Sequence, residues 1–390
     1  MNGTIYMPVG EVCSSISDTY REKKNMVTLI NTSDVLEGRV LNHERVPNSN
    51  LKGQFKKTFQ RDDILYSEIR PQNRRFAYVD FSPIDYIAST KLMVIRAKKD
   101  VVSPKYLYYF LKNSSTVAEL QLLAETRSGT FPQITFSEVA NLTIPVPSLA
   151  VQEVIVQTMQ CLEDKITCNE QINDNLYEMV NAYYTSLFKD VECEMTTIGN
   201  YAERIYSGGT PTTSNAAYWD GAFGWFSSGE TRNRFVISTE KTITQAGIDN
   251  SSTKLAAKHD IVMASAGQGF TRGQTSMLLI DTYVNQSVIV IHAERNVLPY
   301  LFWNLANRYE ELRAISDSSS IRGSLTTKMI ATFEIPLANE ESLQAFADFS
   351  WSVIPQIENN LLENERLAAL RDNLLPKLMS GEIDVSNIQL

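Results

Sequence analysis

The chain has 390 residues, of which 43% are hydrophobic and 21% charged, so its length and composition are typical of a globular protein with two or three domains. It contains no run of about 18 apolar residues and no basic segment followed by an apolar core near its N-terminus, so we expect no membrane span, no secretory signal and a cytoplasmic location. The net charge of −9 argues against nucleic-acid binding, but residues 151–190 and 339–390 carry the whole acidic excess, and residues 1–148 hold more bases than acids.

Residues 1–148 have the pattern of a mixed α+β domain with long loops. Residues 92–95 form a short β-rich run, and residues 104–113 form a short helical stretch. Lysines and arginines gather between such elements, where they can neutralise DNA phosphates and where arginine can read guanine; the alternative is an ordinary solvated surface. The candidate DNA-binding residues of this segment are Lys56, Lys57, Arg70, Arg74 and Arg75.

Residues 149–190 have the pattern of one long helix. From Ile155 to Leu187, apolar and asparagine residues recur in alternating steps of four and three, which is a heptad seam. A buried asparagine weakens a coiled coil but fixes its register and its partner. The predicted seam residues are Ile166, Asn169, Asn173, Leu176 and Leu187.

Residues 191–338 again have a mixed α+β pattern, with β-rich runs at 261–264, 277–280 and 288–291 and a helical stretch at 298–308. The run 207–214 offers hydroxyls and free backbone N–H groups, which can hold a phosphate or approach a base edge. Trp219 and Trp225 follow this run, and they are either core residues or residues that contact DNA. Residues 267–269 lack the third glycine of a dinucleotide-binding fingerprint and are predicted to form a hairpin loop. The candidate DNA-binding residues are Ser207, Gly208, Gly209, Thr210, Thr212, Thr213, Ser214, Gln268 and Arg272.

Residues 339–390 repeat the helical pattern of residues 149–190. A constant offset carries Asn169 to Asn360 and Asn173 to Asn364 without a gap. Pro355 is expected to kink or break this helix near its start. The predicted seam residues are Ile357, Asn360, Asn364, Leu367 and Leu378.

The chain is therefore an internal repeat with the order domain, helix, domain, helix, and we predict its boundaries at 1–148, 149–190, 191–338 and 339–390. Two helices with the same seam can pair within one chain, and the natural arrangement is antiparallel with a pseudo-twofold. The alternative is that each helix packs only onto its own domain. A helix of about 38 residues spans about 57 Å, so such a pair would act as a spacer.

Several motifs resemble those of the specificity subunits of type I restriction-modification systems. Residues 207–214, with Tyr218-Trp219 and Trp225, resemble the Gly-Gly-Thr-Pro opening of a target-recognition domain in that family. Residues 162–166 resemble its central helical region, and residues 374–383 resemble the end of its second helical region. The resemblance covers essentially the whole chain, although residues 1–148 lack the Gly-Gly-Thr-Pro opening.

The resemblance implies two target-recognition domains that each read half of a split DNA site, joined by two long antiparallel helices. The implied partners are double-stranded DNA, two methylase (modification) subunits and restriction-translocase subunits. S-adenosylmethionine, ATP and Mg would bind those subunits, and this chain would hold no cofactor, metal or active site. Accordingly, the sequence has no Asn-Pro-Pro-Tyr methylase motif, phosphate-binding loop or CxxC pair. The alternatives are a protein-binding scaffold without DNA, an enzyme with an unrecognised site, and a related type II system.

Overall fold

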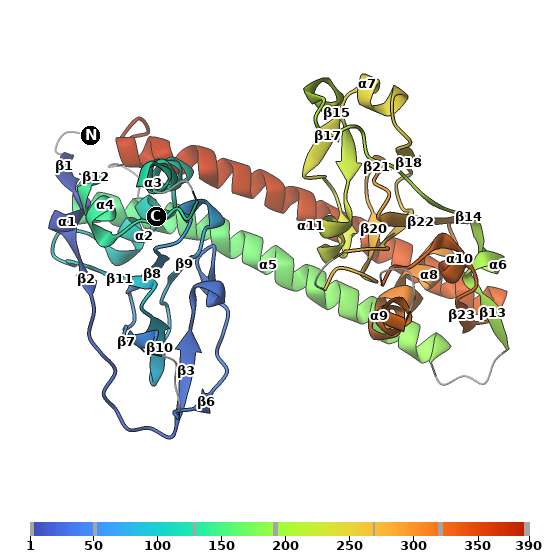
Figure 1. The fold of residues 1–390 in the computed structure, drawn as a ribbon, viewed down its shortest axis with the longest axis horizontal. Coiled ribbons are helices and arrows are strands. Elements are labelled where there is room, and N and C mark those ends of the chain that lie inside the picture. Colours follow the sequence, from blue (N-terminus) through green and yellow to red (C-terminus); the bar gives the residue numbers. More distant parts are fainter. Residues whose placement is uncertain are drawn as a thin grey trace. The chain divides into compact units, whose positions relative to one another are not determined.

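The structure is a computed structural model, and it describes residues 4–49, 53–127, 130–189, 194–267, 270–318 and 323–385. The chain forms two compact units, the first made of Met1–Ile166 and Arg366–Leu390 and the second of Thr167–Glu365. Each unit contains one α+β domain together with a part of each of two long helices (Figure 1). The division runs through the helices because both of them contribute to the core of each unit.

The first unit contains two four-stranded sheets. Sheet A has the order β2-β11-β8-β9, sheet B has the order β6-β3-β10-β7, and β1 pairs with β12. Tyr106 and Tyr109 of α2 pack in the core that covers sheet A. The strands are β1 (Ile5–Pro8), β2 (Cys13–Ile16), β3 (Met26–Ile30), β4 (Val35–Leu36), β5 (Arg39–Val40), β6 (Val46–Pro47), β7 (Phe55–Lys57), β8 (Ile64–Ser67), β9 (Phe76–Tyr78), β10 (Tyr86–Ser89), β11 (Leu92–Ala97) and β12 (Thr143–Val146). The helices are α1 (Val9–Val12), α2 (Pro104–Lys112), α3 (Ser114–Arg127) and α4 (Phe136–Asn141).

The second unit has the same plan. Its sheet A has the order β14-β22-β19-β20-β16, its sheet B has the order β17-β15-β21-β18, and β13 pairs with β23. The strands are β13 (Met195–Thr197), β14 (Ala202–Ser207), β15 (Trp219–Phe226), β16 (Phe235–Val236), β17 (Lys241–Ile243), β18 (Lys254–Ala256), β19 (Ile261–Ala264), β20 (Thr275–Leu278), β21 (Thr282–Val284), β22 (Val288–Ala293) and β23 (Glu334–Pro336). The helices are α6 (Ile198–Tyr201), α7 (Gln245–Asp249), α8 (Leu298–Asn307), α9 (Tyr309–Ser318) and α10 (Thr327–Ala331).

The two domains share strand order and strand direction, except that sheet A of the second domain has β16 as an additional edge strand. In sheet B of the first domain, β10 pairs parallel with β3 and antiparallel with β7; in the second, β21 pairs parallel with β15 and antiparallel with β18. Single hydrogen bonds recur as well: Tyr106 Oη donates to Pro145 O at 2.8 Å, and Tyr300 Oη donates to Pro336 O at 2.5 Å. The repeat predicted from the sequence is therefore one fold built twice.

The two long helices are α5 (Leu149–Phe188) and α11 (Glu340–Ser380). Of the kink or break expected at Pro355, the break is absent, because α11 continues through this residue as one helix. A proline removes one backbone hydrogen bond and crowds the preceding turn, at a cost of about 3 kcal/mol. Val353, Ile354 and Ile357 on both sides of it are at most 7% exposed, and this apolar burial offsets the loss.

Within the second unit, asparagines join α5 and α11. Asn169 Nδ2 donates to Asn364 Oδ1 at 2.8 Å, and Asn360 Nδ2 donates to Asn173 Oδ1 at 2.8 Å. The sequence repeat maps Asn169 onto Asn360 and Asn173 onto Asn364. It therefore converts the Asn169–Asn364 hydrogen bond into the Asn360–Asn173 hydrogen bond, as a twofold axis between the two helices would. From Asn169 to Asn173 along α5, the bonded partner on α11 moves back from Asn364 to Asn360. The two helices therefore run antiparallel, as predicted.

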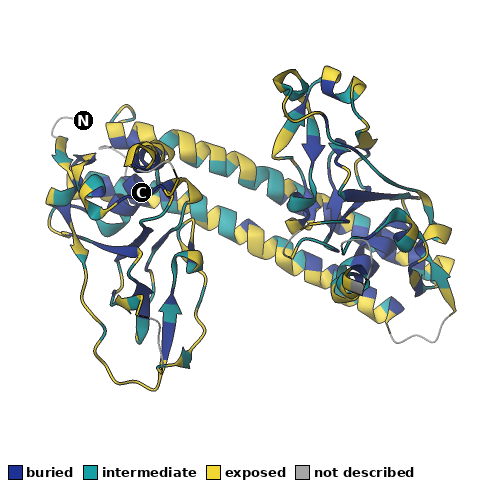
Figure 2. Ribbon diagram, in the orientation of Figure 1, coloured by how far each residue is buried: buried dark blue, intermediate teal, exposed yellow. Residues whose placement is uncertain are grey.

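Most of the remaining seam residues pack in the cores of their own units. Figure 2 shows buried positions along α5 and α11 where they meet each domain. In the second unit, Ile357 is buried and Leu176 and Leu187 pack against the core. In the first unit, Leu378 is buried in a core that includes residues of both helices. Ile166 and Leu367 are half-buried. Each helix thus pairs with the other and also packs onto the domains.

Candidate nucleic-acid interface

The run 207–214 leaves β14 and lies against sheet B of the second domain. A Cβ atom on Gly208 would lie 1.9 Å from the carbonyl oxygen of Val284 in β21, and one on Gly209 would lie 2.1 Å from Ser252 Oγ. Gly209 also donates its N–H to Val284 O at 3.1 Å. The two glycines are therefore needed for a close backbone approach, which any side chain would prevent.

Two tryptophans hold the same run through their indole N–H groups. Trp225 Nε1 donates to Gly209 O at 3.3 Å, and Trp219 Nε1 donates to Thr212 O at 3.3 Å. The two rings meet edge to face with centroids 5.0 Å apart. Trp225 is 5% exposed and is a core residue, yet its N–H also fixes the loop. The spacing of Gly-Gly, Tyr-Trp and Trp in the sequence thus describes one hydrogen-bonded assembly.

The loop presents hydroxyls from this fixed backbone. Thr212, Thr213 and Ser214 are exposed, whereas Ser207 is half-buried. Thr210 Oγ1 donates to the side-chain oxygen of Gln286. Such hydroxyls can donate to phosphate or base-edge acceptors without first ordering the chain.

Arg272 lies in the loop between β19 and β20 and is engaged within the domain. Its Nη1 donates to Gly323 O at 2.6 Å, its Nη2 pairs with Asp317, and 13% of its side chain is exposed. These bonds tie the loop to the end of α9 and to Gly323 beyond it. Gln268 lies outside the described residues, so the predicted hairpin at 267–269 is described only at Gly267.

The basic residues predicted in the first domain separate into two groups. Lys57 Nζ donates to Thr90 O and Leu92 O at 3.1 and 2.8 Å. Lys56 and Arg70 are exposed. Two further arginines bond within the domain: Arg74 Nη2 donates to Ser114 Oγ at 2.9 Å, and Arg75 Nη1 donates to Ser33 O at 3.0 Å. Lys56 and Arg70 therefore present the accessible charge of this set.

A partly buried ion pair connects the first domain to α5. Lys112 pairs with Glu163, and their side chains are 12% and 24% exposed. Tyr109 Oη donates to the other oxygen of Glu163 at 2.9 Å. Burial lowers the pKa of Lys112, and the nearby Glu163 carboxylate opposes this shift. The pair fixes α2 against α5, and that contact lies within the first unit.

The family of the chain follows from its two domains. Residues 6–178 and residues 191–365 each match the type I restriction modification DNA specificity domain. The chain belongs to this family. The chain is 27% identical to the type I restriction enzyme HindI specificity subunit of Haemophilus influenzae, over 92% of this chain and 94% of that protein. It is 25% identical to the EcoR124I/EcoR124II specificity subunit of Escherichia coli, over 73% and 70%.

A solved structure supports the fold. The type I restriction-modification S subunit from M. genitalium matches with a TM-score of 0.56 at 16% identity, covering 97% of this chain and 96% of that one. The prediction of a DNA sequence-specificity subunit is confirmed, and with it the non-catalytic role, because the relatives are named specificity subunits. Among the described residues, no group of three or more His, Cys, Asp or Glu could hold a metal ion. No helix in the described ranges is long and apolar enough to cross a membrane.

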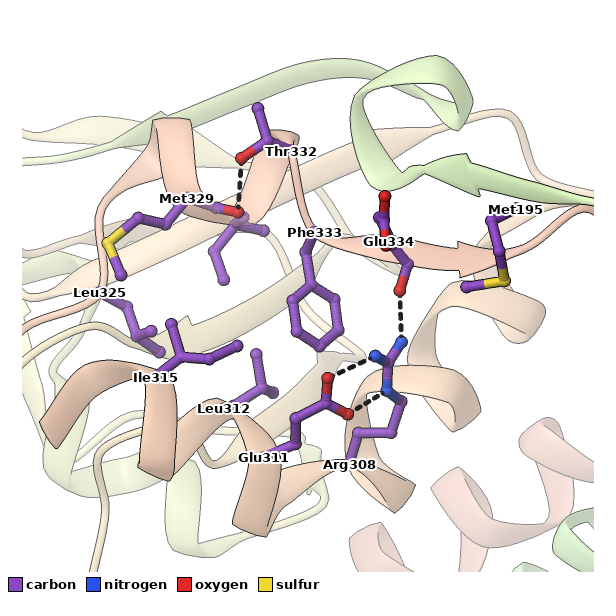
Figure 3. Close-up of a pocket in the computed structure, with 11 residues that line it drawn as sticks. Met195, Arg308, Glu311, Leu312, Ile315, Leu325, Met329, Thr332, Phe333 and Glu334 are labelled. Carbon is purple, nitrogen blue, oxygen red and sulfur yellow. Dashed lines mark hydrogen bonds and ion pairs between the residues drawn. The ribbon is translucent and has the colours of Figure 1, made fainter. Parts of the chain in front are cut away.

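The second specificity domain also contains a cavity of about 420 Å³ (Figure 3). Arg308 Nε and Nη2 each donate to Glu311 at 2.7 Å, and Arg308 Nη1 donates to Glu334 O at 2.6 Å. The guanidinium carbon lies 4.0 Å from the centre of the Phe333 ring. Arginine and glutamate thus neutralise each other, and the lining of the cavity combines polar and apolar groups. The remaining lining residues include Met195, Leu312, Ile315, Leu325, Met329 and Ile330.

His259 of the second specificity domain lies beside two basic side chains, those of Arg295 and Lys258. Its backbone is left-handed, with φ 77°, and its Nδ1 lies 3.5 Å from Arg295 Nη1. Burial, then the charges of Arg295 and Lys258, lower the pKa of His259, and Glu358 and Asp281 oppose this shift. The neutral imidazole is therefore favoured in the folded domain.

Proposed function

We propose that each specificity domain reads one half of a bipartite, asymmetric site on double-stranded DNA, and that α5 and α11 set the gap between the halves. The observation that carries the proposal is one fold built twice with different loop chemistry. The run 207–214 of the second domain is uncharged, whereas the first domain has no such run and exposes Lys56 and Arg70. Two domains with the same fold but different surface residues are expected to bind two different DNA sequences, one for each half-site.

We further propose that the helices bind two modification subunits, which would in turn recruit restriction-translocase subunits in the cytoplasm. The outer faces of α5 and α11 carry much of the acidic excess, including exposed Glu153, Glu170 and Glu178. Like charges on an exposed helix favour a partner with a basic surface. S-adenosylmethionine, ATP and Mg would bind in those partners, and this chain would hold none of them.

A domain exchange tests whether each specificity domain recognises its own half-site. Replacing residues 191–338 with the matching domain of a relative should change one half of the methylated motif and leave the other half intact. The measurement is selection from random DNA by the assembled complex, followed by sequencing. If both halves change together, or if the selected motif is continuous, the bipartite proposal fails.

A paired deletion tests whether the helices set the gap. Removing residues 164–170 from α5 and 363–369 from α11 takes one heptad from each helix, and it removes Asn169 together with Asn364. The helix pair becomes about 10 Å shorter, which corresponds to about three base pairs of DNA. The selected gap should shorten accordingly. A gap of unchanged length would show that the helices do not measure it.

A further inference from the structure

The segment between β2 and β3 of the first domain, residues 17–25, is the topological counterpart of the run 207–214. Both segments leave sheet A from the equivalent edge strand, β2 or β14, and lead to the equivalent strand of sheet B, β3 or β15. Strand order and direction in the two B sheets agree. Residues 17–25 share no motif with 207–214, so the equivalence comes from topology and not from sequence.

Both segments also lie beside the same edge of sheet B. In the first domain, Tyr20 donates its N–H to Lys56 O at 2.8 Å and Thr58 donates its N–H to Asp18 O at 2.9 Å, along the edge strand β7. In the second domain, Gly209 packs against Ser252, which lies two residues before the edge strand β18. Backbone contacts hold each segment beside the sheet, while several of its side chains stay exposed. Others are engaged: Tyr20 Oη donates to Asp85 Oδ1 at 3.1 Å, and Thr210 Oγ1 donates to Gln286.

The chemistry of residues 17–25 is cationic where that of 207–214 is neutral. Arg21, Lys23 and Lys24 are exposed, and Lys56 is exposed on the adjoining strand. The acids of the segment are Asp18 and Glu22, and the Lys24–Glu22 separation is 4.0 Å, a weak surface pair. Cations at this density on a loop fixed to a sheet can contact the sugar–phosphate backbone.

We propose that residues 17–25, together with Lys56, form the DNA-backbone contact of the first specificity domain. The inference rests on the proposed function, because it assumes that the first domain binds one half-site. It assigns phosphate contacts to cations in one half of the complex and to hydroxyls and backbone N–H groups in the other.

The test uses the full-length chain assembled with its modification subunits and a duplex that carries the motif selected by the wild type. The variant is R21Q/K23Q/K24Q. The control is K98Q/K99Q/K105Q, which removes the same charge near α2 of the same domain, together with the Lys99–Asp62 ion pair and the Lys98 Nζ hydrogen bond to Glu11 O. Affinity is measured between 50 and 300 mM KCl. Because each phosphate contact contributes about 0.9 to the slope of log affinity against log salt, the variant should lower the slope by two to three. Its affinity at 100 mM salt should fall at least tenfold.

The control should change the slope by less than one, and K56Q alone should lower it by about one. Thermal melting checks that each variant is folded, and K56Q carries the test if the triple variant is not. An unchanged slope in R21Q/K23Q/K24Q, or an equal loss in the control, would overturn the inference. If the wild type selects a bipartite motif but the salt slope of R21Q/K23Q/K24Q is unchanged, this inference fails and the proposed function stands. If the wild type selects no bipartite motif, the proposed function itself fails.

Discussion

Replacing Gly208 by alanine would separate the position of the 207–214 loop from its chemistry. The new Cβ would lie 1.9 Å from Val284 O, and real Cβ contacts below 3.0 Å are essentially never seen, so the loop must move by more than about 1 Å. Overpacking of this kind costs about 1–3 kcal/mol of stability. The change adds one methyl group and removes no donor, so any effect on DNA comes from displacement.

The displacement should weaken recognition of one half-site. A lost base contact costs about 1–3 kcal/mol, which corresponds to about a 5- to 150-fold loss of affinity. The affected bases should all belong to the half-site of the second domain. Competition binding against single-base variants of the selected motif, with melting temperatures measured in parallel, gives both quantities.

Gly229→Ala is the matched control. It is the same substitution in the same domain, but the nearest atom to the new Cβ is Ser227 Oγ at 4.0 Å, so the side chain enters open space. This variant should bind like the wild type. If Gly208→Ala also bound every base variant like the wild type while remaining folded, the 207–214 loop would not be part of the reading surface.

Three further changes have expected outcomes. Asn169 Nδ2 donates to both Asn364 and Glu363, so Asn169→Ala should lower the free energy of unfolding by about 1–3 kcal/mol in urea titrations; an unchanged free energy of unfolding would contradict the role of this residue. The pKa of His259 is lowered in the folded chain, so the folded state favours the neutral imidazole. The contribution of His259 to stability is complete at pH values above the ordinary pKa of 6.5 and is lost as the pH falls below that value. The melting temperature of His259→Gln should therefore change less between pH 7.5 and 5.5 than that of the wild type; an equal change would contradict this role. Glu163→Gln leaves the Lys112 ammonium buried without its carboxylate and should cost about 3 kcal/mol, and adding Lys112→Met should recover most of this loss; a double variant no more stable than the single one would refute the ion-pair account.

The amino-acid sequence alone determined the repeat, the long helices and the family. These features depend on periodicity: heptad spacing dictates which face of a helix is buried, and the constant offset between Asn169 and Asn360 persists because both helices pack in the same way. The loop at 207–214 could also be recognised from the sequence. Its glycines and the two tryptophans that bond to it lie within 20 residues of one another, so they form one local sequence pattern.

Only the tertiary structure decided which charged residues are available and which segments correspond. Arg75 and Lys57 bond to carbonyls more than 30 residues away, and such partners leave no trace in local spacing. The break expected at Pro355 is absent because burial in a core assembled from distant segments outweighs a local helix propensity. The correspondence of residues 17–25 with 207–214 was likewise invisible in the sequence. A sheet constrains its strands through burial and pairing, whereas the loops between strands are free to change their composition entirely.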